Sequence, residues 1–89
     1  MSESVEERIY TVPLSRAWVA PPYRRAEKAI SLLREFVQRH MKPEEIIIQP
    51  TVNEAIWARG IKKPPRRIRV RLSKDEEGAV TVSLAEAEP

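Results

Sequence analysis

Residues 53–71 read NEAIWARGIKKPPRRIRVR, and the character of this stretch changes twice along its length. It starts with the pattern of a short helix that ends at Gly60, because glycine is common just after a helix. It continues as a cationic loop, residues 62–66, which two prolines stiffen. It ends as a strand in which arginines alternate with aliphatic residues. One face of that strand carries Arg67, Arg69 and Arg71, and the other carries Ile68, Val70 and Leu72.

The charge of the basic stretch, residues 59–71, is one-sided. It contains seven basic side chains and no acidic one. The whole chain has a net charge of only +3, from 16 basic and 13 acidic residues, so the local excess is far above the mean. Residues 1–7 and 75–89 hold acidic side chains and no basic ones. This asymmetry predicts a polyanionic partner for the basic stretch, and a nucleic acid in particular.

A hairpin is predicted at the end of the basic stretch. Residues 67–74 and 79–84 have strand patterns, and residues 75–78 read DEEG between them. Gly78 can adopt the positive φ that a tight hairpin turn needs. In the second strand apolar and polar side chains alternate, so one face of the hairpin is expected to be buried.

Residues 24–41 form the clearest predicted helix. Apolar side chains recur at the spacing of one helix face, which is the pattern of a helix that covers a sheet. His40 lies in the last turn, where a cation suits the helix dipole, and we expect it at the surface rather than in catalysis. The predicted core side chains of this helix are Ala26, Ala29, Ile30, Leu33, Phe36, Val37 and Met41.

Three shorter elements complete the predicted fold. Residues 8–14 are rich in strand-forming side chains. Residues 44–49 contain three consecutive isoleucines, which favour a short buried strand. Thr51 and Glu54 fit a capping box that starts a short helix over residues 51–59.

The order of these elements predicts one small domain over residues 1–89. Its fold class is α+β, with a mixed β-sheet of three to four strands that one long and one short helix cover on one face. A chain of 89 residues has the length of a single domain. Flexible acidic tails are expected at about residues 1–6 and 85–89.

The composition excludes most kinds of catalytic or cofactor site. The chain has no cysteine, which excludes disulfides, thiolate zinc sites and cysteine nucleophiles, and suits a reducing cytosol. Its two glycines are too few for a phosphate-cradling loop, and its one histidine leaves no usual nucleophile–base pair. We therefore expect no enzyme, no cofactor and no metal site. No apolar run approaches about 18 residues, so no membrane span is predicted.

The basic stretch is the candidate binding site. Lysines and arginines beside phosphates release counterions, and an arginine can direct two N–H groups to phosphate oxygens. The stiff loop would lose little entropy on binding. The alternative is that these charges only solvate an edge strand and prevent aggregation. The candidate polyanion-binding residues are Trp57, Arg59, Lys62, Lys63, Arg66, Arg67, Arg69 and Arg71.

The two tryptophans each allow two interpretations. Trp57, just before the basic stretch, fits either a core anchor or a platform on which a base stacks. Trp18, in the connection of residues 15–22, fits either a cover over an open end of the core or a stacking contact with a base or a partner. Both alternatives stay open at the level of the sequence.

Several motifs resemble the L31e family of archaeal and eukaryotic large-subunit ribosomal proteins. In and next to the basic stretch they are NEA at residues 53–55, WARG at 57–60 and IRVR at 68–71. Residues 7–14 (ERIYTVPL) are similar to the family's first strand, and RAEKAI, LREF and RHM within residues 25–41 are similar to its long helix. The resemblance covers roughly residues 7–72. Residues 15–23 depart from the family pattern, with Trp18 and a Pro-Pro pair where a more basic stretch is expected, so no contact is assigned to them.

This resemblance implies a structural constituent of the large ribosomal subunit that binds the long ribosomal RNA near the polypeptide exit tunnel. It implies a cytoplasmic, ribosome-bound protein without enzymatic activity. The implied partners are large-subunit rRNA, neighbouring ribosomal proteins and nascent-chain factors at the tunnel exit. The family motif assigns rRNA contacts to Arg59, Arg69 and Arg71, and the charge pattern adds Lys62, Lys63, Arg66, Arg67 and Trp57.

Two other functions stay open beside the ribosomal one. The first is a free-standing DNA- or chromatin-binding module with the same charge pattern. The second is a protein-binding adaptor whose acidic tails and hairpin turn bind basic partners. A preference for duplex DNA over structured RNA favours the first, and loss of a protein partner on removal of the tails favours the second.

Overall fold

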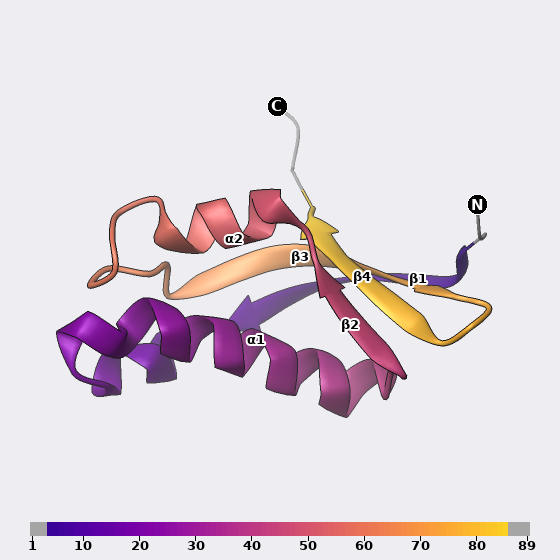
Figure 1. The fold of residues 1–89 in the computed structure, drawn as a ribbon, viewed down its shortest axis with the longest axis horizontal. Coiled ribbons are helices and arrows are strands. Elements are labelled where there is room, and N and C mark those ends of the chain that lie inside the picture. The colour runs from indigo at the N-terminus through magenta and orange to yellow at the C-terminus, as the bar shows by residue number, and fades with distance from the viewer. Residues whose placement is uncertain (1–3, 86–89) are drawn as a thin grey trace.

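The structure of the chain is a computed structural model that describes residues 4–85. It has two layers, a four-stranded mixed sheet and two helices that pack on one face of it (Figure 1). The strands are β1 (Ser4–Pro13), β2 (Glu45–Ile48), β3 (Arg67–Asp75) and β4 (Ala79–Leu84). The helices are α1 (Arg25–Met41), α2 (Pro50–Trp57) and two short 3-10 helices, η1 (Ser15–Val19) and η2 (Pro22–Arg24). The predicted α+β fold class is confirmed.

The strand order in the sheet is β1-β3-β4-β2. β3 pairs antiparallel with β1 on one side and with β4 on the other. β2 pairs parallel with β4 and forms an edge. The strand that ends the basic stretch is therefore an inner strand of the sheet, with hydrogen-bonded neighbours on both sides.

The alternation within β3 divides its side chains between the core and the solvent, as the sequence predicts. Ile68, Val70 and Leu72 are buried against the helices. Their cross-strand partners Val12 and Val82 are buried in the same cluster. The opposite face of the sheet is not covered by a helix, and it presents the three alternating arginines.

The long helix α1 supplies much of the core, as predicted. Its bounds match the predicted residues 24–41 to within one residue. Leu32 is also buried, although it falls outside the predicted stripe, while Ile30 and Phe36 are only partly buried. His40 is exposed in the last turn, where its ring stacks on Phe36 at 4.0 Å and Nδ1 lies 3.0 Å from the Phe36 carbonyl oxygen.

The predicted capping box of the short helix α2 is wrong. No side chain caps its N-terminus, and the N-cap residue is Gln49 rather than Thr51. Pro50 occupies the first helical turn, where its missing N–H costs no helical hydrogen bond. The backbone carbonyl of Gln49 accepts the N–H groups of Val52 and Asn53 instead. The helix ends at Trp57, two residues earlier than predicted, so Gly60 does not directly follow it. Gly60 lies in the connection beyond the helix and has the positive φ, +94°, that glycine favours.

β1 begins earlier than the sequence predicts. The predicted strand starts at residue 8, but β1 starts at Ser4 and pairs along its length with β3. Ser73 on β3 donates a hydrogen bond of 3.1 Å to the Glu7 carboxylate. Residues 4–6 of the predicted N-terminal tail thus belong to the sheet, and residues 1–3 and 86–89 lie outside the described part of the chain.

β2 is less buried than predicted, because it lies at the edge of the sheet. Ile46 and Ile48 are half-buried against the core, whereas Ile47 is 44% exposed on the uncovered face. Three consecutive isoleucines thus divide between the two faces of an edge strand. None of the helices within residues 4–85 is both long enough and apolar enough to cross a membrane.

Candidate nucleic-acid interface

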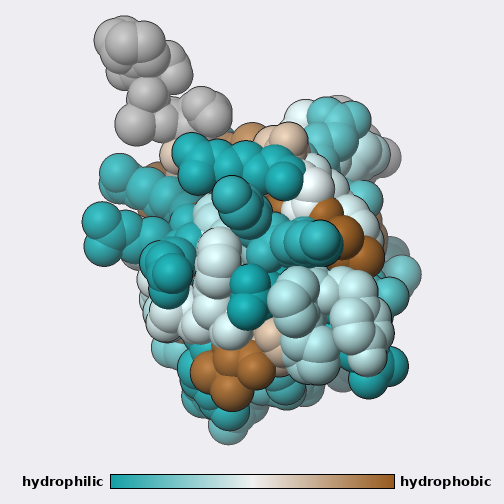
Figure 2. Space-filling model, turned by 90° about the vertical axis from the view of Figure 1, so that its left-hand side faces the viewer, coloured by the Kyte–Doolittle hydropathy of each residue, from teal (hydrophilic) through white to brown (hydrophobic). Residues whose placement is uncertain are grey.

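The α2–β3 connection, residues 58–66, carries the cationic loop to one end of the molecule. It lies there beside η1, η2 and the start of α1 (Figure 1, left). All seven basic residues of the basic stretch are exposed. Figure 2 looks onto this end and shows a mostly hydrophilic surface with small hydrophobic patches. The predicted site is therefore accessible to a partner.

Four of the predicted residues surround one hollow of about 350 Å³, here called the loop hollow. It lies between the last turns of α2, where Ala55 lines it, and the α2–β3 connection, where Ala58 and Pro65 line it. Its basic lining residues are Arg59, Lys63, Arg66 and Arg67. A concave surface lined by four cations can place several N–H donors around one phosphate group.

The arginine row, consisting of Arg67, Arg69 and Arg71, extends from the loop hollow along β3. Alternate residues of a strand lie about 6.6 Å apart, so the three guanidinium groups form a regular line on the uncovered sheet face. Their cross-strand neighbours on β1 are Pro13, Thr11 and Ile9, none of which is charged. The row and the hollow share Arg67 and form one continuous cationic surface.

The position of β3 contradicts the alternative that these charges only protect an edge strand. β3 is an inner strand, so its backbone has no free edge to shield. Within residues 4–85 none of the seven basic side chains forms an ion pair; an ion pair does form between Arg8 and Glu6, at 2.6 Å. The pKa of Arg8 is raised, first by its hydrogen bond to the Tyr10 hydroxyl and then by the charge of Glu6. The seven basic side chains of the basic stretch are thus exposed and without an ion pair within residues 4–85.

Trp18 has a role that neither sequence interpretation described. Its ring contacts two guanidinium groups, with the Arg25 Cζ atom 4.8 Å and the Arg66 Cζ atom 4.4 Å from the ring centroid. Its indole Nε1 donates a hydrogen bond of 3.1 Å to the carbonyl oxygen of Pro64. The half-buried Trp18 therefore holds the cationic loop from within the same molecule, through two cation–π contacts and one hydrogen bond.

The backbone of the α2–β3 connection is tied to the rest of the molecule at several points. Leu14 donates its N–H to the Arg66 carbonyl at 2.7 Å, and Ala26 donates to the Ile61 carbonyl at 3.1 Å. Arg25 Nη1 lies 3.5 Å from the carbonyl oxygen of Lys62. Pro64 is fully buried beneath these contacts. This anchoring presents Lys62, Lys63 and Arg66 from a loop with defined contacts.

Trp57 is 37% exposed at the C-terminal end of α2 and does not belong to the buried core. This position favours the interpretation of Trp57 as a surface platform over that of a core anchor. It adds an aromatic surface close in sequence to Arg59.

Other kinds of site have little support in the described residues. Within residues 4–85, no group of three or more His, Cys, Asp or Glu side chains could hold a metal ion. His40 packs against Tyr10 and Phe36, away from the basic stretch in sequence and on a different element.

The fold and this site define a small α+β protein with a continuous cationic surface suited to a nucleic acid. A model of the ribosomal protein L31e family matches residues 4–79, and the chain belongs to this family. The family membership that the sequence motifs indicate is confirmed.

Similar proteins from archaea support this assignment. The chain is 57% identical to the large ribosomal subunit protein eL31 of Methanopyrus kandleri, over 97% of this chain and all of that protein. It is 48% identical to eL31 of Hyperthermus butylicus, over 94% of this chain and 87% of that protein. It is 45% identical to eL31 of Methanothermobacter thermautotrophicus, over 90% of this chain and 99% of that protein.

Proposed function

We propose that this chain is a structural constituent of the large ribosomal subunit and binds large-subunit rRNA through the basic stretch. One observation carries the proposal: seven exposed basic side chains form no ion pair within residues 4–85 and extend from the loop hollow to the arginine row. The names of the similar archaeal proteins support the ribosomal context. No catalytic step is part of this function.

The contacts are mainly to phosphate oxygens and 2′-hydroxyls. A line of arginines on a rigid sheet matches a backbone that bears a charge at each nucleotide, whereas it offers few groups suited to reading a base edge. RNA helices are recognised largely by shape through such contacts. The anchored cationic loop adds Lys62 and Lys63 to the same surface, and Trp57 supplies a platform for an unpaired base.

The proposed location is the subunit surface near the polypeptide exit tunnel. The family resemblance supports this location, which makes neighbouring ribosomal proteins and nascent-chain factors further partners. The acidic hairpin turn with Glu76 and Glu77 lies at the opposite end of the sheet from the cationic loop (Figure 1). Because of this separation, one end of the molecule can bind RNA while the acidic end can contact a basic partner.

The test replaces Arg67, Arg69 and Arg71 together with glutamate. We expect this variant to lose most of its co-sedimentation with large ribosomal subunits in high salt, because three attractive contacts become repulsive. The matched control replaces Arg34, Arg39 and Lys42 with glutamate; these are exposed residues in the second half of α1 and just beyond its end. Normal co-sedimentation of the arginine-row variant, with its circular dichroism spectrum unchanged, would contradict the proposal.

The salt dependence of binding provides a second measurement. If about six phosphates are contacted, a plot of log affinity against log salt concentration for the isolated protein and an rRNA transcript has a slope of about −4 to −5. A competition experiment with duplex DNA separates rRNA binding from a DNA-binding function. A clear preference for the duplex would favour the DNA-binding module.

A further inference from the structure

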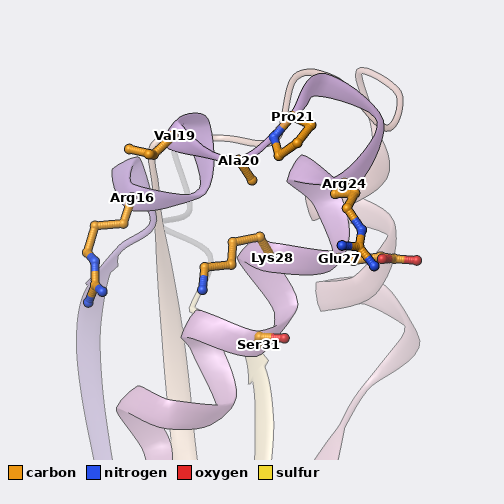
Figure 3. A pocket seen from close by; sticks show the side chains of 8 residues that line it. All are labelled: Arg16, Val19, Ala20, Pro21, Arg24, Glu27, Lys28 and Ser31. Carbon is orange, nitrogen blue, oxygen red and sulfur yellow. The ribbon is translucent and has the colours of Figure 1, made fainter.

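A second hollow lies at the same end of the molecule, in the segment to which the sequence assigns no contact. It has a volume of about 530 Å³ and lies between the η1–η2 segment and the first two turns of α1. We call it the η hollow. Lys28 extends from α1 into it, with Arg16 of η1 on one side and Arg24 of η2 on the other (Figure 3). Three elements thus bring three cations around one concavity.

The charge of the η hollow is not balanced within the described residues. It contains the cations Arg16, Arg24 and Lys28 and a single carboxylate, that of Glu27. In the part of the chain that the structure describes, none of these four side chains forms an ion pair or a hydrogen bond. The Ser31 hydroxyl adds a neutral donor at the α1 side. The net positive charge of the concavity suits an anionic group.

Exposed apolar groups adjoin these cations. Val19, which lines the η hollow, is 87% exposed. Tyr23, in η2 beside the lining residues, is 65% exposed. A nucleotide combines an anionic phosphate with a flat, largely apolar base, and an aromatic or aliphatic surface beside a cation fits both parts.

The walls of the η hollow are fixed by local contacts. Arg25 Nε donates a hydrogen bond of 3.1 Å to the Ala20 carbonyl, and Arg24 N–H donates one of 2.8 Å to the Pro21 carbonyl. Two consecutive prolines, Pro21 and Pro22, restrict the backbone between η1 and η2. The hollow therefore needs little ordering to receive a ligand.

Trp18 connects the η hollow to the basic stretch. Arg25, which bonds to the Ala20 carbonyl in the hollow wall, also makes a cation–π contact with Trp18, and Arg66 of the cationic loop makes a second one with the same ring. Arg66 in turn lines the loop hollow. The cations at this end of the molecule thus follow one another in space from Arg24 at the η hollow to Arg67 at the loop hollow. A single nucleic-acid strand can run along them.

We propose that the η hollow is a second RNA-binding site, which takes a backbone phosphate and the adjoining nucleotide of the RNA bound by the basic stretch. The identity of the ligand rests on the proposed function, and the site itself rests on the geometry of η1, η2 and α1. This site assigns RNA contacts to Arg16, Arg24 and Lys28. An acidic protein segment is the other ligand that this charge could attract, and the experiments below separate it from RNA.

The first experiment compares two pairs of arginine substitutions in the full chain. Arg16→Gln with Arg24→Gln removes two cations from the η hollow, and Arg34→Gln with Arg39→Gln removes two exposed arginines of α1 that do not line it. The probe is a transcript of the large-subunit rRNA of Methanopyrus kandleri. We expect the first pair to weaken binding on the order of tenfold at about 0.1 M salt and to make the log–log slope shallower by about 1 to 2. Equal affinities and slopes for the two pairs would overturn the proposal.

The second experiment places a photo-reactive benzoylphenylalanine at Val19, at Lys62 or at Glu76, one site per variant. All three residues are exposed, and Glu76 in the hairpin turn gives the background. We expect the variants at Val19 and at Lys62 to crosslink to the transcript. We expect the Val19 variant not to crosslink to biotinylated polyglutamate of matched charge, which represents an acidic protein segment. Crosslinks at Lys62 without crosslinks at Val19 would overturn the second site alone. Absence of crosslinks at both positions would instead count against the proposed function, and labelling of polyglutamate from Val19 would assign the η hollow to an acidic protein segment.

Discussion

At the scale of single residues, Trp18 makes the connection between two parts of the cationic surface. Replacing Trp18 with leucine removes two cation–π contacts, worth about 0.5–1 kcal/mol each, and the hydrogen bond to Pro64, worth about 1 kcal/mol. We expect Trp18→Leu to lower the free energy of unfolding by about 2 kcal/mol in denaturant titrations. Amide exchange of Leu14 and Ala26, which bond to the α2–β3 connection, should accelerate more than that of β4.

Binding to RNA distinguishes positioning by Trp18 from a direct contact. Trp18→Leu leaves every cation in place, so affinity should fall while the salt slope stays the same. Trp18→Phe, which keeps an aromatic face for Arg25 and Arg66, should recover part of the affinity. Trp57→Leu, at the more exposed tryptophan, is the control for amide exchange and should leave the Leu14 and Ala26 rates unchanged. Unaltered exchange in Trp18→Leu would show that the contacts to Trp18 do not hold the loop.

The two glycines differ in what surrounds them, although both have positive φ. At Gly60 (φ +94°) an added Cβ would meet no atom within 4 Å, so Gly60→Ala bears only the backbone strain, about 1 kcal/mol. At Gly78 (φ +91°) the added Cβ would lie 2.6 Å from Glu44 Cγ and would disturb the tether from Glu44 N–H to the Gly78 carbonyl. We expect Gly78→Ala to cost about 1–3 kcal/mol more than Gly60→Ala in thermal or chemical unfolding. Equal losses would show that the Glu44 side chain moves aside freely.

At the scale of elements, β3 shows which features of this fold are local enough to predict. Arginine alternates along β3 with Ile68, Val70 and Leu72, so residues adjacent in the sequence are enough to predict which face of the strand is buried and which is exposed. The structure confirms both predictions. The helix over residues 24–41 is predictable for the same reason, because its apolar stripe is also a local pattern. The edge position of β2 is not predictable in this way, since it depends on pairing between strands that lie far apart in the sequence.

The edge position of β2 leads to a prediction that compares neighbouring isoleucines. Ile46 lies opposite Val80 and packs against the core, whereas Ile47 lies on the uncovered face. Threonine preserves β propensity at either position, so a difference in stability reports burial. We expect Ile46→Thr to cost about 1–2 kcal/mol and Ile47→Thr less than about 0.5 kcal/mol. The reverse order would mean that β2 pairs in a register shifted by one residue.

The placement of the candidate-site residues, like the fold, was predictable only where the sequence pattern is local. The basic stretch is contiguous in the sequence, and all seven of its cations are exposed where a partner can reach them. The Trp18 contacts escaped prediction because Pro64 is 46 residues away in the chain. The η hollow escaped it because Arg16, Arg24 and Lys28 are too widely spaced for one strand or helix face, and only the two 3-10 turns bring them together.

At the scale of the whole molecule, the cationic loop and the acidic turn lie at opposite ends of the longest axis. The cationic loop and both hollows lie at one end, and the turn between β3 and β4, with exposed Glu76 and Glu77, lies at the other (Figure 1). The Cα atoms extend 38 Å along this axis. The Debye length is about 8 Å at physiological ionic strength and about 30 Å at 0.01 M, so the two ends interact with a common ligand only in dilute salt. The acidic turn should therefore influence encounter with RNA at low salt and have no effect on the complex at physiological salt.

Substitution of the acidic turn tests this separation. Glu76→Lys with Glu77→Lys changes the charge of the turn by +4, because each substitution replaces −1 with +1. At about 0.15 M salt we expect the affinity for the rRNA transcript to stay within twofold of the unsubstituted chain, while at about 0.01 M salt the association rate should rise severalfold. Stopped-flow binding at both salt concentrations measures the two effects. A gain in affinity of tenfold or more at 0.15 M would place RNA within about one Debye length of the turn, and would mean that the bound RNA covers the far end of the sheet as well as the cationic end.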